Sequence, residues 1–237
     1  NGRRRQRQMC IRDRSFSGNL IYDKRPLITE SELQLSFGRG GDFVNGVGVI
    51  GGAETTLTYS AADGTMPELT LASENGGGAL KGLRVTDTIR SGEMFLKTRF
   101  IDGYKNFDTN IRITNFTVVE APTAVRAFSV LAPAGLYDLV EGEGTGFSWG
   151  EASIETRGSE VVLRQVTGQG QAVSVAFVGK YDRESRQADV SGNLVPASFL
   201  SQIIGAIPLV GEILTGVDNA GLFVTQFSFQ GDIDDPS

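Results

Sequence analysis

Residues 92–100 read Gly-Glu-Met-Phe-Leu-Lys-Thr-Arg-Phe, a stretch in which apolar and polar side chains alternate. Met94, Leu96 and Phe100 fall on one side of an extended chain, whereas Lys97 falls on the other. A period of two is typical of a β-strand that has one apolar and one solvated face. The stretch therefore predicts a strand of a half-buried sheet.

The same alternation recurs along most of the chain from Phe16 onward, and short breaks rich in Gly, Asp and Asn separate its runs. Strands joined by short turns of this composition pair antiparallel. Taking the apolar members of each run together predicts one inward face. That predicted face consists of Leu33, Leu35, Phe37, Leu57, Met94, Leu96, Phe100, Ile111, Ile113, Val173, Val175, Phe177, Phe223, Phe227 and Phe229.

Three stretches interrupt the alternation and predict short helices near 77–85, 122–140 and 196–214. The last is amphipathic, because its apolar residues recur with helical spacing. We expect Phe199, Ile203 and Ile207 in it to close one end of the sheet or to contact a membrane. Its Gly and Pro residues argue against a membrane-spanning helix.

The chain has 237 residues with no His and a single Cys, which excludes Ser-His-Asp and Cys-His catalytic sites and any internal disulfide. We therefore expect no catalytic residue, no cofactor and no metal. The glycine-rich runs lack the remaining residues of a nucleotide-binding loop. Glu141 and Glu143 leave open an alternative as an acid pair in a polysaccharide hydrolase.

Residues 1–14 contain six Arg and one Asp without apolar periodicity, and we interpret them as a non-native or disordered leader before a domain at 15–237. Without the leader, 16 basic residues (22 less 6) and 27 acidic residues (28 less 1) remain, a net charge of −11. So acidic a domain is expected to repel nucleic acid, which Lys and Arg bind through phosphates.

A sheet must cover its apolar face with something. The predicted fold is mainly β: a curved, largely antiparallel sheet that forms an apolar groove, with three short helical segments. The alternative is a structural or adhesive β-protein in which the same side chains form a dry core.

Several stretches, in this order, resemble the C-terminal region of the AsmA-like family, which includes TamB-type and YhdP-type bridge-like lipid transport proteins. They are Gly-Gly-Ala-Leu-Lys-Gly-Leu (77–83), Ile-Arg-Ser-Gly-Glu-Met (89–94), Phe-Thr-Val-Val-Glu-Ala-Pro (116–122), Gly-Leu-Tyr-Asp-Leu (135–139), Ile-Pro-Leu-Val-Gly-Glu-Ile-Leu (207–214) and the final strand running into Asp-Pro (223–236). The resemblance covers roughly residues 16–237.

The resemblance implies a periplasmic protein of a Gram-negative envelope, tethered to the inner membrane through a segment outside this fragment. It further implies a β-groove that handles phospholipid transport or outer-membrane homeostasis. The expected partners are phospholipid acyl chains and envelope membrane proteins. This chain lacks the family's anchor and most of its length, so it would be one section of such a groove, near the distal end.

Overall fold

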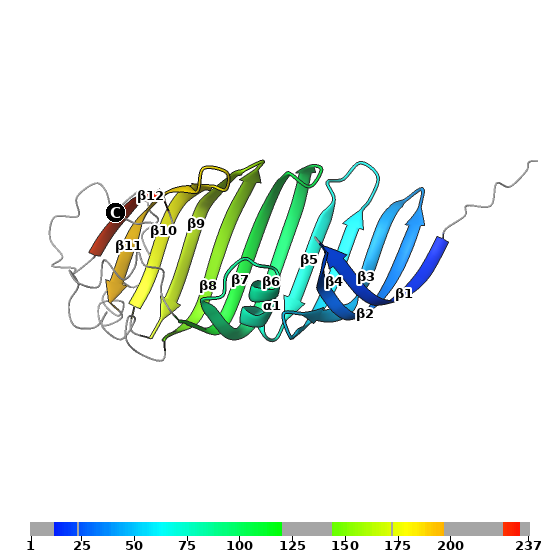
Figure 1. The fold of residues 1–237 in the computed structure, drawn as a ribbon, viewed down its shortest axis with the longest axis horizontal. Helices are drawn as coiled ribbons and strands as arrows, with labels where there is room; N and C mark the ends of the chain where they lie inside the picture. The colour runs from blue at the N-terminus through cyan, green and yellow to red at the C-terminus, as the bar shows by residue number, and fades with distance from the viewer. Residues whose placement is uncertain (1–11, 23, 120–143, 172, 197–224, 233–237) are drawn as a thin grey trace, which may run out of the picture.

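The computed structural model describes residues 12–119, 144–196 and 225–232, apart from residues 23 and 172. Twelve strands form one open antiparallel sheet in which every strand pairs with its neighbours in sequence (Figure 1). The strands are β1 (Arg12–Tyr22), β2 (Arg25–Gly38), β3 (Gly41–Ile50), β4 (Ala53–Ala61), β5 (Glu68–Ser73), β6 (Ile89–Asp102), β7 (Asn106–Val118), β8 (Thr145–Arg157), β9 (Glu160–Gly170), β10 (Val173–Asp182), β11 (Gln187–Pro196) and β12 (Thr225–Asp232).

The predictions of a mainly β fold and of antiparallel strands joined by short turns are confirmed. Residues 12–14, which the composition assigned to the leader, belong to β1. One helix, α1 (Gly76–Gly82), occurs in the described part of the chain, close to the predicted 77–85. The other two predicted helices fall on 122–140 and 196–214. Apart from residue 196 at the end of β11, these ranges lie outside the described residues, as do Phe199, Ile203 and Ile207.

Local hydrogen bonds define both ends of α1. Asn75 caps the first turn, because its side-chain oxygen accepts a hydrogen bond from the backbone N–H of Gly78 (3.1 Å). At the other end Arg84 adopts a left-handed conformation (φ 59°), and the N–H of Val85 donates to the carbonyl of Leu80 (2.9 Å). This reversal ends the helix three residues before the predicted boundary.

Several strands bend where single residues take up a left-handed backbone conformation. Glu30 in β2 (φ 52°), Ser91 in β6 (φ 56°) and Asn115 in β7 (φ 53°) are non-glycine examples. The β2–β3 register shifts around Glu30, and Asn115 lies between two paired residues of β7. Irregularities of this kind bend a strand and increase its twist.

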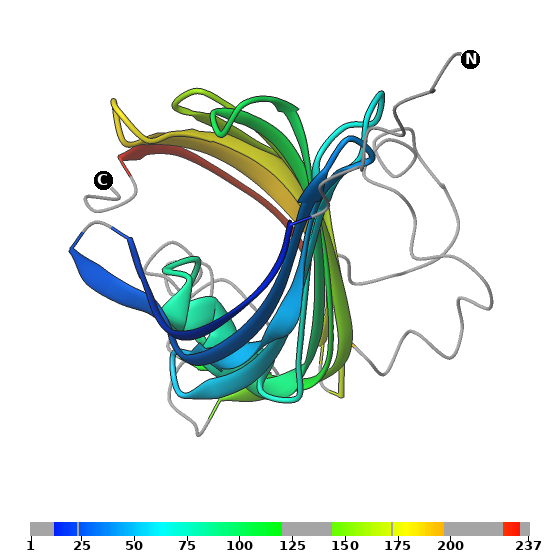
Figure 2. The same cartoon turned by 90° about the vertical axis from the view of Figure 1, so that its right-hand side faces the viewer.

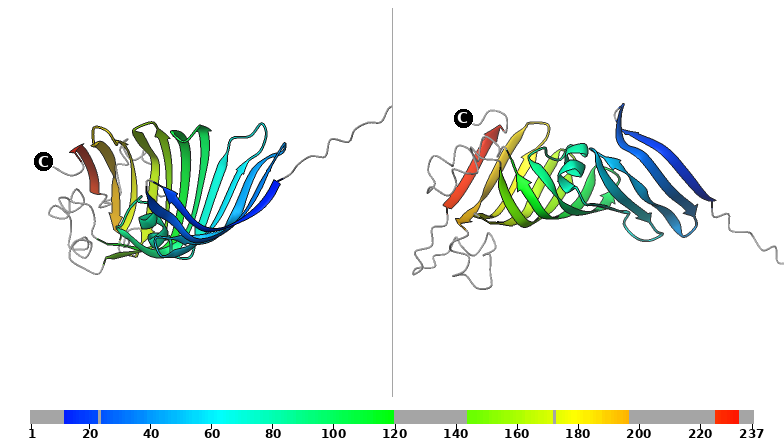
Figure 3. Two further views of the ribbon diagram at one scale, coloured as in Figure 1. Left: turned by 45° about the vertical axis from the view of Figure 1, so that its right-hand side comes forward. Right: turned by 90° about the horizontal axis from the view of Figure 1, so that it is seen from below.

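The bends give the sheet one concave and one convex side. Seen along the long axis, the strands curve around α1, which lies on the concave side (Figure 2). Strands β1 and β12 form the two edges, at opposite ends of the sheet (Figure 3). The helix packs chiefly against β6 and also contacts β3, β4, β5 and β7.

Glycines let the helix backbone approach the strands closely. A Cβ atom on Gly77 would lie 2.6 Å from the carbonyl oxygen of Ile89 and 2.7 Å from the Cα of Arg90. Ala79 and Leu80 of α1 are fully buried in the same core cluster as Met94 of β6. The helix is therefore a fixed part of the core.

The close approach predicts that Gly77→Ala destabilises the protein, although Ala is favoured over Gly inside a helix by about 1 kcal/mol. Because the added methyl group meets backbone atoms, we expect a loss of about 1–3 kcal/mol in the free energy of unfolding. Urea unfolding measures it. Gly146→Ala is the control, since a Cβ there has no neighbour within 4 Å. A stabilised Gly77→Ala variant would contradict the close packing.

Candidate binding site on the concave face

A row of apolar side chains crosses the whole sheet on the side of α1. In an antiparallel sheet, residues directly opposite each other on neighbouring strands share a face. Following these pairs from β1 to β12 gives one unbroken row, here called the central row, of ten apolar residues and two glycines. It consists of Phe16, Leu33, Gly46, Leu57, Leu71, Leu96, Ile111, Ala152, Val166, Phe177, Gly192 and Phe227.

A second row runs beside the first on the same face, two residues away on each strand except β9, where a register shift makes the separation three residues. We call it the rim-side row, because it lies nearer the rim formed by the β2–β3, β4–β5 and β6–β7 turns. From β2 to β12 it carries no charged side chain. It consists of Arg14, Leu35, Val44, Tyr59, Leu69, Thr98, Thr109, Ile154, Leu163, Gly179, Val190 and Phe229.

Of the fifteen residues predicted for the inward face, all but Phe223, which lies outside the described residues, are on the concave side. Six belong to the central row, two belong to the rim-side row, and the others lie on either side of these rows. The fourteen are Leu33, Leu35, Phe37, Leu57, Met94, Leu96, Phe100, Ile111, Ile113, Val173, Val175, Phe177, Phe227 and Phe229.

The sequence interpretation missed other members of this face. Leu69 and Leu71 alternate with Thr70 in β5, a signal that the sequence does contain. Phe116 and Phe147 stack across β7 and β8 with ring centroids 5.2 Å apart and an interplanar angle of 12°. Their pairing depends on the register of two strands that lie far apart in sequence, so alternation within one strand could not reveal it.

Aromatic rings cover several glycines on the concave face. The ring of Phe116 lies over Gly150, with its Cζ 3.0 Å from where a Cβ would stand, and the ring of Phe147 lies over Gly168 at 3.2 Å. Rings that lie across glycines in this way protect the strand backbone from water. At these two positions an aromatic ring thus covers the backbone that glycine would expose.

Burial varies over the concave face: Leu57 and Ile111 of the central row are half-buried, whereas Val173 of β10 is 2% exposed. Near α1 the side chains are packed away from solvent, with Leu71 and Met94 each 3% exposed. From β8 to β12 the large apolar side chains of both rows are half-buried, and no described element other than the sheet lies there. They are Ile154, Leu163, Val166, Phe177, Val190, Phe227 and Phe229.

One hydrogen-bonded pair of hydroxyl groups lies in the middle of the rim-side row. Thr98 and Thr109 are buried opposite each other on β6 and β7, and their Oγ1 atoms are 2.9 Å apart. The mutual hydrogen bond offsets the cost of removing two hydroxyls from water. The rim-side row therefore contains two neutral, hydrogen-bonded hydroxyl groups and no charged side chain on β6 and β7.

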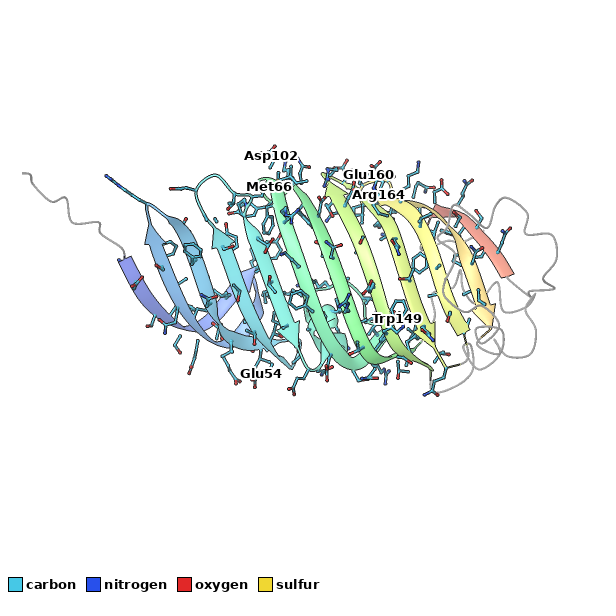
Figure 4. All side chains as sticks on the ribbon, turned by 180° about the vertical axis from the view of Figure 1, so that it is seen from behind. Glu54, Met66, Asp102, Trp149, Glu160 and Arg164 are labelled. Carbon is cyan, nitrogen blue, oxygen red and sulfur yellow. The ribbon has the colours of Figure 1, made fainter. Side chains whose placement is uncertain are left out.

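The convex face carries cross-strand ion pairs (Figure 4). Arg112 contacts Glu151 (2.6 Å), and Arg157 contacts Asp108 (2.8 Å). Arg164 binds Glu155 through two nitrogens, each 2.9 Å from a carboxylate oxygen, and this hydrogen bonding lowers the pKa of Glu155. Exposed pairs of this kind add little stability, but they favour one register.

The β10–β11 turn is organised by Asp182. Its carboxylate accepts hydrogen bonds from the hydroxyl of Ser159 (2.7 Å), from the backbone N–H of Ser185 (2.7 Å) and from the hydroxyl of Ser185 (2.9 Å). Ser159 belongs to the β8–β9 turn, so the carboxylate joins two neighbouring hairpins at one rim. These hydrogen bonds, that of Ser159 foremost, lower the pKa of Asp182 to about 2.

Other kinds of site find no support in the described part of the chain. No group of three or more Asp, Glu or Cys side chains there is placed to hold a metal ion, and its one helix is too short to cross a membrane. Glu141 and Glu143, the candidate acid pair, lie outside the described residues. Compared with known proteins, the chain matches no family model, no curated protein and no solved structure.

The hydroxyl pair predicts a non-additive double-mutant cycle. Thr98→Val or Thr109→Val alone leaves a buried hydroxyl without its partner and should cost about 1–3 kcal/mol. The double variant should recover most of that loss, because no orphaned hydroxyl remains. Thermal or urea unfolding of the four proteins measures the coupling, and additive losses would mean that the two hydroxyls act independently.

The lowered pKa of Asp182 predicts a pH-dependent contribution to stability. A carboxyl group whose folded pKa lies below its unfolded value stabilises the fold above the unfolded pKa and loses this effect as pH falls through the folded pKa. Asp182→Asn should therefore have a lower unfolding midpoint than wild type at pH 7, and the difference should shrink between about pH 4 and pH 2. Asp63→Asn, at an exposed turn, is the control. A difference that is constant across this range would contradict the assignment.

Proposed function

We propose that this chain is a non-catalytic section of a lipid-handling protein, and that its concave face binds phospholipid acyl chains. The observation that carries the proposal is the central row, an apolar path through all twelve strands. The resemblance to AsmA-like proteins supports the same function. With it we propose a periplasmic location and a tether to the inner membrane outside this fragment.

The dimensions of the row suit acyl chains. Twelve strands define eleven interstrand steps of about 4.8 Å, so the row is roughly 53 Å long. This exceeds the about 30 Å thickness of the hydrocarbon core of a bilayer. The part from β8 to β12, which α1 does not cover, spans four of these steps, about 19 Å, and so exceeds the about 15 Å that one leaflet contributes to that core.

The energetics favour an unbroken path. Each buried methylene group contributes about 0.8 kcal/mol, so a polar gap in the row would cost several kcal/mol for a chain crossing it. From β2 to β12 neither row carries a charged side chain, whereas the convex side carries the ion pairs described above. This distribution allows an apolar guest on one side and water on the other.

The half-buried part of the face is where we place the bound chains. The rows from β8 to β12 present large apolar side chains that are half-buried, whereas the part beneath α1 is packed by the helix itself. We therefore propose that acyl chains contact Val166, Phe177 and Phe227 rather than Leu71 or Met94.

A structural β-protein with a dry core is the second candidate. The burial of Leu33, Leu71, Met94 and Ile113 favours it, since each of these side chains is no more than 4% exposed. In this case the concave side chains would contact only one another, and the purified protein would carry no lipid. The two functions differ in what is bound and can be separated by one measurement.

Native mass spectrometry of the purified chain tests the proposal. We expect co-purified phospholipid on the wild type and on the order of ten-fold less on Val166→Asp, because a charge replaces a side chain whose burial contributes about 1.5–3 kcal/mol. Gln165→Asp is the matched control, since Gln165 immediately precedes Val166 in β9 and is exposed on the convex side. It should retain lipid as the wild type does. A folded wild type without lipid supports the dry core.

Photocrosslinking locates the bound chains. Benzoylphenylalanine at position 227, on the concave face of β12, should crosslink to phospholipid in vesicle-incubated protein. The same group at position 228, exposed on the convex side, should give at most a tenth as much product. Equal yields would contradict a concave binding site. Circular dichroism checks that both proteins are folded.

A further inference from the structure

One rim of the sheet carries exposed apolar side chains at one end and polar side chains at the other. Five hairpin turns lie at this rim: β2–β3, β4–β5, β6–β7, β8–β9 and β10–β11. The first three carry large exposed apolar side chains at or beside their tips, which we call the apolar tips. They are Phe37 (40% exposed), Met66 (53%), Ile101 (42%) and Tyr104 (90%).

The last two turns of the same rim are polar and tied together. Glu160, Arg183 and Glu184 are exposed there, and the guanidinium of Arg183 donates to the carbonyl of Gly158 (2.9 Å) across the two turns. Met66 and Asp102 lie near each other on this rim, away from Glu160 (Figure 4). The apolar side chains are thus confined to the half that precedes β8.

Contacts hold the apolar tips next to the concave face. The N–H of Phe100 donates to the carbonyl of Pro67 (2.8 Å), which joins the β4–β5 turn to β6. The ring of Phe100 contacts Tyr104 edge-on, with centroids 6.3 Å apart, and lies 6.0 Å from the ring of Phe107. Phe100 and Phe107 face each other beside the rim-side row. An apolar surface therefore runs from the exposed tips onto the concave face.

We infer that the apolar tips are a docking site for the interface of a zwitterionic phospholipid bilayer. Separate side chains that protrude from hairpin tips enter a fluid interface more readily than they fit a firm protein surface, and Tyr suits the headgroup level because one end is apolar and the other polar. This inference rests on the proposed function. The docking site would be the place where an acyl chain passes between the membrane and the concave face.

Charge favours a zwitterionic over an anionic membrane. At the three turns that bear the apolar tips and the strand ends beside them, Arg39 and Lys105 are exposed cations, and Asp42, Asp63 and Asp102 are exposed anions. The whole chain has a net charge of −6, and an acidic protein is repelled by anionic lipid surfaces. The local mixture can meet both the phosphate and the choline of a zwitterionic headgroup.

Vesicle flotation with phosphatidylcholine tests this inference. We expect the wild type to float and the triple variant Met66→Ser/Ile101→Ser/Tyr104→Ser to float on the order of ten-fold less, because three apolar side chains no longer enter the interface. The matched control is Ile21→Ser/Tyr22→Ser/Phe95→Ser, which removes three side chains of similar size and exposure (70%, 70% and 49%) away from this rim. It should float as the wild type does.

Three results would overturn the inference: a wild type that does not float, equal losses in both triple variants, or a rim variant whose change in size-exclusion profile shows that the tips contact a second copy. The proposed function fails separately. If the rim variant no longer floats but Val166→Asp and the wild type carry equally little lipid, the docking site stands and the binding face does not. If the wild type binds lipid but does not float, the binding face stands and the docking site does not.

Discussion

The register between strands is the constraint on which the rest of this molecule depends. Because side chains alternate with a period of two, a slip of one residue would move an apolar side chain from the concave to the convex side. The central row exists only because eleven successive pairings keep the same face in phase, although the β1–β2, β2–β3, β6–β7, β8–β9 and β9–β10 pairings all contain register shifts. Ion pairs such as Lys97–Glu68 oppose a slip from the other side of the sheet. The apolar rows and the outer charges therefore specify one register together.

Curvature is the second requirement, and it comes from the backbone. A flat sheet would expose both faces equally, whereas left-handed residues such as Glu30 and Asn115 bend the strands around α1. The helix in turn depends on glycine, since a methyl group on Gly77 would meet the backbone of β6. The bends bring the strands around the helix, and the glycines let the helix lie close enough to the strands to be buried.

The alternation in the sequence predicted which side chains share a face, but it did not predict where the strands bend. Met94, Leu96 and Ile113 lie on one face of the sheet, and alternation within a strand reports directly which side chains share a face. The bends could not be predicted, because Glu30 and Ser91 are not residues whose type signals a left-handed backbone. The stack of Phe116 on Phe147 required the register of β7 with β8, which the intervening 26 residues hide from any local pattern. Apolar side chains look the same in a sequence whether protein or lipid covers them, so residue type does not distinguish a core from a lipid-binding face.

The proportions of the described elements bear on this question. A helix of seven residues is only about 10 Å long, whereas the sheet extends over roughly 53 Å. Helix α1 can therefore bury the apolar face of the strands around β6, and the rows continue well beyond it in both directions. An apolar face of that extent needs further cover. Acyl chains would provide it without adding any polar group that the rows, free of charge from β2 to β12, would have to satisfy. On the proposed function, bound lipid would cover the half-buried part of the rows that α1 leaves uncovered.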